Sequence, residues 1–366
     1  MLMNSQEITG QAAVAANKAT RAENKARMAA NKAAVAANKA VKTASGQIEI
    51  VTILRGLAAT SVLLFHLICA RHGYIAGKYM VAVFNYGRYG VQFFFVISGF
   101  VIPYSMMMAH YHLRDFFRFL QKRIVRIEPP YLVILAITVA FLFLRGRLVD
   151  HTQLDITWQQ VALHIGYLIP FSHYEWLSIV FWTLAIEFQF YLFFSLAFPI
   201  FTGRRAGRWL ITALLISLQW LGPLDTQFFY WAPIFLMGIY LALGKQKKIS
   251  TAELGIAIGI LAVISFFKFG LVIDLFALTA VAAIYFEPKI RSRILDFLGN
   301  ISYSLYLSHT LVAFAILNLS IRYARSPSQK IFFVTLAFAA TLLFSYLLFY
   351  FVERPAKKWA ARIKYK

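Results

Sequence analysis

Long apolar runs follow one another from Ile50 almost to the end of the chain, separated by short polar and basic segments. A helix that crosses a bilayer needs about 20 mostly apolar residues, and fewer where it is short or shielded. The pattern therefore predicts an all-α integral membrane protein with about ten transmembrane helices. The predicted helices cover residues 50–70, 83–109, 130–146, 176–200, 208–222, 228–244, 252–267, 270–286, 297–319 and 331–352.

The basic residues between these runs predict an orientation. Of the 37 Lys and Arg residues, 27 fall in the terminal segments and in alternate loops, and nine fall in the remaining loops. Cytoplasmic segments of membrane proteins carry an excess of Lys and Arg. The N- and C-termini are therefore both expected to be cytoplasmic.

Composition narrows the class of protein further. The chain is 60% hydrophobic and 14% charged, whereas soluble domains have about a quarter charged residues. The net charge of +22 raises the possibility of nucleic-acid binding, but the apolar content argues against it. Cys69 is the single cysteine, which excludes an intramolecular disulfide and a cysteine zinc cluster. We expect no metal site and no nucleic-acid partner.

Three regions are predicted along the chain. Residues 1–46 form a basic Ala/Asn/Lys-rich tail, helical or disordered, with alanines spaced three and four apart. This tail would lie on an anionic leaflet, or its Ala stripe would support self-association. Residues 47–358 form the multispan domain, and residues 359–366 form a second basic tail.

Few ionisable residues interrupt the apolar runs: Arg55, His66, Glu187, Asp274 and His309. Such residues are costly within a bilayer, so they mark candidate sites. Arg55 and His66 are eleven residues apart, which places them on one helix stripe about 16 Å apart along the axis. Glu187 needs a partner, and a His or Arg from another span is the economical choice. For each residue a structural role stays open: a snorkelling Arg55, a packed His66 or His309, a helix-clasping Glu187, and an Asp274 that pairs with Lys268 at the edge of its span.

The sequence from Leu54 to His66 resembles the Arg-x10-His signature that opens acyltransferase family 3. Further matches to that family follow in its order. They lie at residues 90–100, 122–131, 182–191, 298–309 and 353–355. The family comprises integral-membrane O-acyltransferases that act on O-antigens, exopolysaccharides and related carbohydrates.

The resemblance implies transfer of an acyl group, often acetyl, from acyl-CoA to a hydroxyl of a surface polysaccharide or glycolipid at the inner (plasma) membrane. His66 is the expected general base, and Glu187 would orient it or accept the proton itself. Arg55, Arg123 and Arg126 would bind the phosphates of the donor. Alternatively, Arg123 and Arg126 could only fix the side of the membrane on which their loop lies. Acyl-CoA is a substrate here, and no permanently bound cofactor is expected.

A multispan transporter or flippase of a lipid- or sugar-linked substrate is the alternative. On composition alone, ten spans with a few buried ionisable groups fit a transporter as well as an acyltransferase. Transporters often show repeated halves with broken helices, and no such repeat is visible in this sequence. The ordered motif series therefore favours the acyltransferase. Ser98-Gly99 within that series is expected to allow close helix packing, rather than to supply a nucleophile.

Overall fold

The computed structural model describes residue 28 and residues 49–69, 77–147, 156–220 and 225–365. The chain divides into two units, Met1–Ile48 and Glu49–Lys366. Apart from Met28, everything described below belongs to the second unit. The predicted N-terminal helix and its self-association lie outside the described residues.

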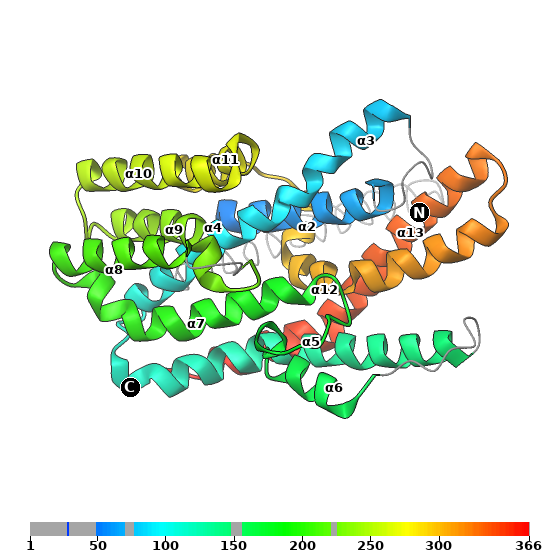
Figure 1. The fold of residues 1–366 in the computed structure, drawn as a ribbon, viewed down its shortest axis with the longest axis horizontal. Helices are drawn as coiled ribbons and strands as arrows, with labels where there is room; N and C mark the ends of the chain where they lie inside the picture. Colours follow the sequence, from blue (N-terminus) through cyan, green and yellow to red (C-terminus); the bar gives the residue numbers. More distant parts are fainter. Residues whose placement is uncertain (1–27, 29–48, 70–76, 148–155, 221–224, 366) are drawn as a thin grey trace, which may run out of the picture. The chain divides into compact units, whose positions relative to one another are not determined.

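The described part of the second unit consists of helices and connecting segments, without β-strands (Figure 1). Its principal helices are α2 (Glu49–Cys69), α3 (Lys78–Asn85), α4 (Gly90–Met108), α5 (Phe116–Arg145), α6 (Trp158–Ile165), α7 (Phe181–Thr202), α8 (Arg205–Leu218), α9 (Ala232–Lys245), α10 (Thr251–Phe269), α11 (Leu271–Phe286), α12 (Arg293–Tyr323), α13 (Pro327–Leu348) and α14 (Arg354–Arg362). A π-helical turn, η6 (Phe349–Glu353), joins α13 to α14.

Eight of the helical segments in the described residues are long and apolar enough to cross a membrane. This confirms a multi-pass, all-helical architecture. The two remaining predicted runs are also helical but shorter, since α8 has 14 residues and α11 has 16. The count of ten and the orientation of the termini stay predictions.

α5 begins much earlier than its apolar run suggests. The run was expected from residue 130, whereas the helix starts at Phe116 and continues through Pro129 and Pro130. Proline lacks the N–H that an interior helical position donates, so these two residues obscure the helix in the sequence. Because α5 already begins at Phe116, Arg123 and Arg126 lie about one turn apart on a single helix.

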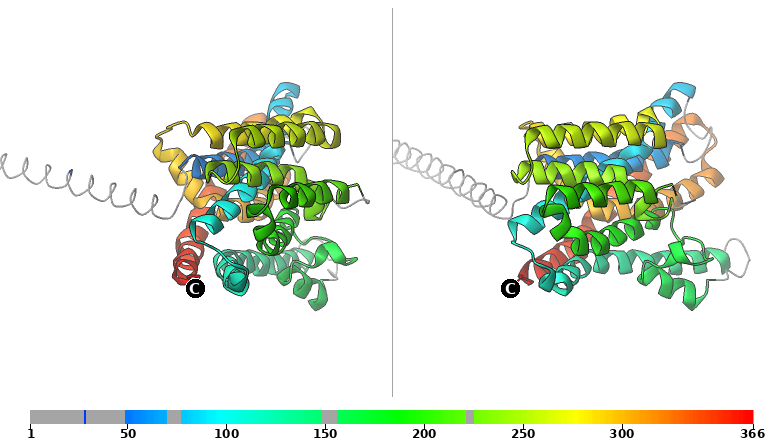
Figure 2. Two further views of the ribbon diagram at one scale, coloured as in Figure 1. Left: turned by 90° about the vertical axis from the view of Figure 1, so that its left-hand side faces the viewer. Right: turned by 60° about the vertical axis from the view of Figure 1, so that its left-hand side comes forward.

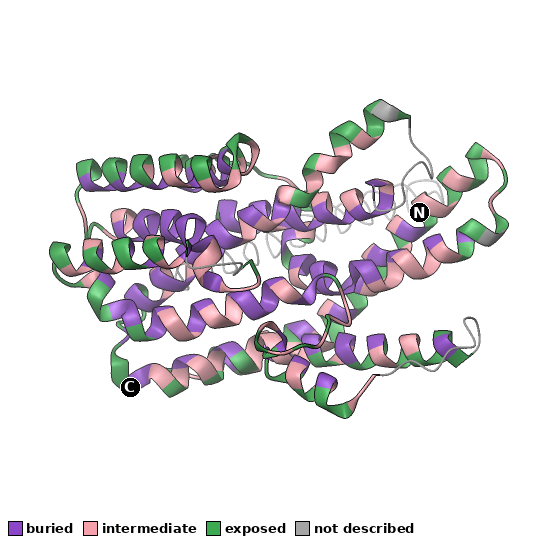
Figure 3. Ribbon diagram, viewed as in Figure 1, coloured by how far each residue is buried: buried purple, intermediate pink, exposed green. Residues whose placement is uncertain are grey.

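Two close helix crossings organise the core. α4 packs against α9, where a Cβ at Gly99 would clash with the carbonyl oxygen of Phe235. This agrees with the packing role expected for that glycine. All residues of α9 from Ala232 to Leu243 are buried, and α9 appears largely purple in Figure 3.

The second crossing joins α2 to α12. A Cβ at Gly56 would lie 2.6 Å from the backbone nitrogen of Gly299, and one at Gly299 would clash with the carbonyl oxygen of Thr52. The two backbones therefore touch beside Arg55. The views in Figure 2 show α2 (blue) among the other helices of this unit. This crossing brings the opening motif of the sequence against the closing motifs on α12.

Basic segments far apart in the sequence meet at helix ends. Arg118 donates a 3.4 Å hydrogen bond to the Lys364 carbonyl, and the Tyr111 and Tyr365 rings are 5.8 Å apart. Lys245 pairs with Glu287 at 2.7 Å. These contacts join the 109–118 segment to the C-terminus and the end of α9 to the end of α11. They pair segments that the charge pattern assigns to the same side of the membrane.

Candidate active site

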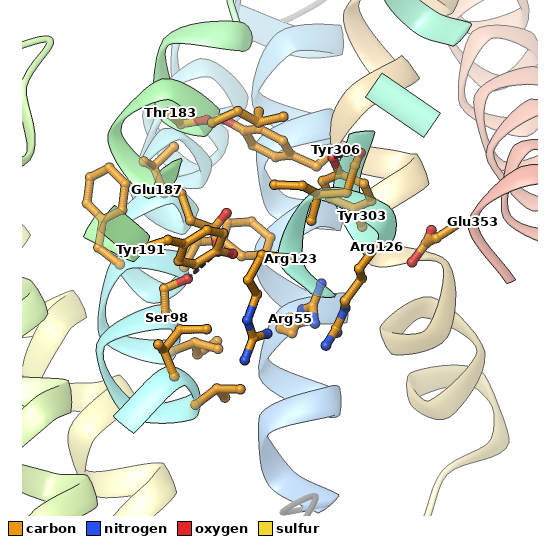
Figure 4. Close-up of a pocket in the computed structure, with 18 of the residues that line it drawn as sticks. Arg55, Ser98, Arg123, Arg126, Thr183, Glu187, Tyr191, Tyr303, Tyr306 and Glu353 are labelled. Atoms are coloured by element: carbon orange, nitrogen blue, oxygen red, sulfur yellow. Dashed lines mark hydrogen bonds between the residues drawn. The ribbon is translucent and has the colours of Figure 1, made fainter. Parts of the chain in front are cut away.

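A cavity of about 90 Å³ lies among the helices that carry the sequence motifs (Figure 4). This volume is enough for several water molecules. Its polar and charged lining residues come from seven helical segments. They are Arg55 of α2, Ser98 of α4, Arg123 and Arg126 of α5, Thr183, Glu187 and Tyr191 of α7, Tyr303 and Tyr306 of α12, Glu353 of η6 and Lys357 of α14.

Cations outnumber carboxylates in this lining, with three arginines and one lysine against two glutamates.

Arg123 is 6% exposed, and its Nη2 donates to Ser105 Oγ at 3.1 Å. Its guanidinium lies 5.2 Å from the Phe119 ring centroid and 5.7 Å from that of Tyr191. Its Nε is buried and has no hydrogen-bond partner. A buried donor of this kind is costly unless it is paired, so it suits an anionic ligand.

Glu187 is held by hydroxyl groups. Its Oε1 accepts a 2.7 Å hydrogen bond from Ser98 Oγ and a 2.5 Å bond from Tyr191 Oη. A histidine or arginine was expected as its partner, but these two hydroxyls take that place. Hydrogen bonds to a carboxylate are shorter and stronger than neutral ones, so the carboxyl group is firmly positioned at the cavity wall.

Glu353 forms the second acidic position. Its Oε2 accepts from the Ser304 backbone N–H at 3.1 Å and from Ser304 Oγ at 2.6 Å, and the carboxylate forms an ion pair with Lys357. The residue is 1% exposed. It ends the π-helical turn η6, a type of irregularity found frequently at functional sites. Through Glu353, the last of the sequence motifs is thus bonded to α12 at the cavity wall.

A pair of hydrogen-bonded hydroxyls, from Thr183 and Tyr306, also lines the cavity. Thr183 Oγ1 and Tyr306 Oη are 2.8 Å apart, and Tyr306 is 7% exposed. In Figure 4 Thr183 and Tyr306 lie in the upper part of the view, while Arg55, Arg123 and Arg126 lie lower. Tyr303 donates to the carbonyl oxygen of Ile127 at 2.8 Å and so ties α12 to α5.

His66 lies outside this lining, farther along α2 than Arg55. Its Nδ1 is 2.9 Å from the Val62 carbonyl oxygen and 3.2 Å from Nε2 of His309, whose own Nδ1 is 2.7 Å from the Tyr306 carbonyl oxygen. A carbonyl oxygen can only accept, so each Nδ1 carries a proton. His309 then accepts through Nε2, and the neutral ring of His66 has its lone pair on Nε2.

Comparison with known proteins decides the family. A family profile described as an acyltransferase domain matches residues 48–350. The chain belongs to acyltransferase family 3. This confirms the resemblance seen in the motif series.

Several curated proteins are similar to the chain. The O-acetyltransferase OatA of Staphylococcus aureus is 28% identical over 181 residues, which are 46% of this chain and 28% of that protein. A putative acetyltransferase of Acidianus two-tailed virus is 25% identical over 289 residues, 71% of this chain and 81% of its own length. A putative O-acetyltransferase of S. aureus strain COL is 24% identical over 359 residues, 83% of this chain and 56% of that protein. No solved structure matches the chain.

In this acyltransferase 3 family member, four of the five predicted site residues meet at one cavity: Arg55, Arg123, Arg126 and Glu187. Their roles stay predictions, as does that of His66. Sequence reasoning gave no chemical role to further residues that contact Glu187 or line the cavity. They are Ser98, Tyr191, Tyr306, Glu353 and Lys357. All but Lys357 fall within the six recognised motifs, so membership of a motif was the signal available.

Proposed function

We propose that the chain is a membrane-bound O-acyltransferase of the inner (plasma) membrane. It transfers an acetyl group from acetyl-CoA to a hydroxyl of a carbohydrate such as a surface polysaccharide or glycolipid. The observation that carries this proposal is the cavity where arginines from α2 and α5 lie together with the hydroxyl-bound carboxylate of Glu187. The relatives from S. aureus are named as an O-acetyltransferase and a putative O-acetyltransferase, and these names support acetyl as the group transferred.

The cations suit a donor that carries phosphates. Arg55, Arg123 and Arg126 line the cavity from two helices, and a guanidinium can bind a phosphate oxygen pair with two parallel N–H donors. The buried, unpaired Nε of Arg123 supplies a further donor. The phosphates of CoA therefore bind at this end, with the acyl end of the molecule directed toward Thr183 and Tyr306.

The reaction forms a C–O bond and breaks a C–S bond. The acceptor hydroxyl attacks the thioester carbonyl carbon, its proton passes to a base, and CoA leaves as a thiolate that is then protonated. Nε2 of His66 carries the lone pair for this proton. His66 lies about 16 Å along α2 from Arg55, a separation that the long pantetheine arm can bridge from a phosphate bound at the arginines.

The test uses membranes that contain the full chain and acetyl-labelled acetyl-CoA, with label followed into extracted glycans and lipids. We expect label in a carbohydrate product from the wild type, and little from Glu187→Gln, which preserves the shape and the acceptor oxygen but removes the charge. Movement of a glycolipid across the membrane without acetyl-CoA, and without label transfer, would favour the transporter instead.

A further inference from the structure

A second cavity of about 310 Å³ lies beyond the Thr183–Tyr306 pair. It is formed by the last part of α5, the segment before α7 and the later turns of α12. Six of its lining residues matter for its chemistry. They are Thr138, Arg145, Ser178, Thr310, Phe314 and Asn318.

The two cavities share one face of α12. Tyr303 and Tyr306 line the first cavity, and Thr310 and Phe314 line the second. Tyr306 and Thr310 are four residues apart, which corresponds to about 6 Å along the helix. Ser178 Oγ and Thr310 Oγ1 are 3.2 Å apart. About one helical turn of α12 therefore separates the cavities. Two hydroxyl pairs lie in this region, Thr183–Tyr306 and Ser178–Thr310.

The lining of the second cavity is suited to a hydroxyl-rich ligand. Thr138 is 5% exposed, and its Oγ1 is buried with no hydrogen-bond partner. A buried hydroxyl without a partner is rare, and this one belongs to a residue of the cavity wall. Ser178 and Thr310 add hydroxyls, Asn318 adds an amide, and Phe314 adds an aromatic ring. Arg145, which is exposed, adds a cation.

We propose that the second cavity binds the carbohydrate acceptor, with Arg145 facing an anionic group of that molecule. This inference rests on the proposed acyltransferase function and assigns the acceptor to a place distinct from the donor cavity. The ring centroid of His66 lies 5.9 Å from that of Phe314 and 4.9 Å from that of His309. Phe314, which lines the second cavity, therefore also packs against the ring of the expected base.

Photocrosslinking in living cells tests occupancy without requiring activity. A benzophenone amino acid replaces Leu142 of α5 or Phe314 of α12, which line the cavity from two different helices, and replaces Leu319 as a control. Leu319 is a neighbour of Asn318 but is 51% exposed and is not among the described lining residues. We expect adducts that contain glycan, detected by mass spectrometry, from positions 142 and 314 and not from 319.

Kinetic variants provide the second measurement. Thr138→Val and Thr310→Val each remove one hydroxyl and should raise the acceptor concentration needed for half-maximal labelling by about 5- to 10-fold, while the acetyl-CoA requirement is unchanged. Thr279→Val, on α11, removes an exposed hydroxyl that bonds to its own helix and should have no effect.

The outcomes separate the two proposals. Label transfer by the wild type, with no glycan adduct from well-inserted position-142 and position-314 variants, overturns the acceptor site and leaves the acyltransferase intact. Glycan adducts without any transfer from acetyl-CoA overturn the acyltransferase and leave the carbohydrate site. Phospholipid adducts alone at all three positions also overturn the acceptor site.

Discussion

Nε2 of His309 lies 3.2 Å from Nδ1 of His66, so that the two rings form a buried pair between α12 and α2. The carbonyl oxygens of Val62 and Tyr306 fix the protonated nitrogen of each ring. The Nδ1–H of His66 faces both the Val62 carbonyl oxygen and Nε2 of His309, so the lone pair of His66 lies on its Nε2. The two histidines are 243 residues apart in the sequence.

Loss of the expected base should abolish most of the activity. His66→Ala in well-inserted protein is expected to reduce acetyl transfer by about 10²- to 10⁴-fold, the usual contribution of a general base. His309→Ala removes one hydrogen bond to His66 and should cost only about 2- to 10-fold, with a shifted pH–rate profile. Labelled-product assays across pH measure both effects. Wild-type transfer by His66→Ala would show that the base is another group.

Arg55 should act on the donor. Arg55→Gln is expected to raise the apparent KM for acetyl-CoA by at least about tenfold, because hydrogen bonds to charged groups contribute about 1.5–3 kcal/mol. Arg354→Gln is the control. Arg354 lies on α14 beside the Tyr350 ring and is not among the described residues that line the cavity. A fall in kcat with an unchanged KM for acetyl-CoA would contradict a phosphate-binding role for Arg55.

Ser98 should prove to be a supporting residue. Ser98→Ala removes one of the two hydroxyl donors to Glu187 Oε1 while Tyr191 remains, so a loss of about 2- to 10-fold is expected. Glu187→Gln should lose far more. The comparison is made at saturating acetyl-CoA, and intact-protein mass spectrometry checks for a covalent acetyl group. An acetylated Ser98, together with complete inactivity of Ser98→Ala, would instead identify a nucleophile.

The α2–α12 crossing should be sensitive to a single methyl group. Gly299→Ala places a Cβ against the Thr52 backbone, and overpacking of this kind costs about 1–3 kcal/mol. We expect a lower thermal unfolding midpoint in detergent. Gly259→Ala on α10 meets no atom within 4 Å and should unfold at or above the wild-type temperature. Equal midpoints for the two variants would argue against a tight crossing.

His164 should make the segment beside the second cavity sensitive to acid. Its Nδ1 donates to the Gln160 carbonyl, and its Nε2 accepts from the Leu177 N–H at 3.1 Å. Burial lowers the pKa of His164 from the usual 6.5. Its packed neighbours include the Trp176 and Phe181 rings, and the Tyr131 hydroxyl donates to its carbonyl oxygen.

The sign of the effect follows from this lowered pKa. The neutral ring favours the folded form above pH 6.5, and that contribution declines as the pH falls below 6.5, where the unfolded chain binds the proton more readily. Amide exchange at Leu177, corrected for its intrinsic rate, should therefore accelerate between pH 6.5 and 5. In His164→Gln, which accepts without titrating, the change should disappear. A corrected rate independent of pH in the wild type would refute this role.

The sequence by itself determined the helical, multi-pass class and four of the residues that line the first cavity, Arg55, Arg123, Arg126 and Glu187. Apolar runs are local, and each run is long enough to define a helix without knowledge of its neighbours. Arg55 and Glu187 were recognisable for the same local reason, because a charge within an apolar run is costly. The start of α5 was missed because consecutive prolines argue locally against a helix that the surrounding packing nevertheless maintains.

Only the tertiary structure decided which residues meet. Glu187 was expected to pair with a histidine or arginine, but Ser98 and Tyr191 hold it, and His66 pairs instead with His309. These pairings depend on which helices cross and at what depth. The crossings depend in turn on backbone contacts at glycines such as Gly56 and Gly299, far apart in the chain. Periodicity along one helix contains no information about the neighbour that it will pack against, so the two cavities could emerge only from the assembled helices.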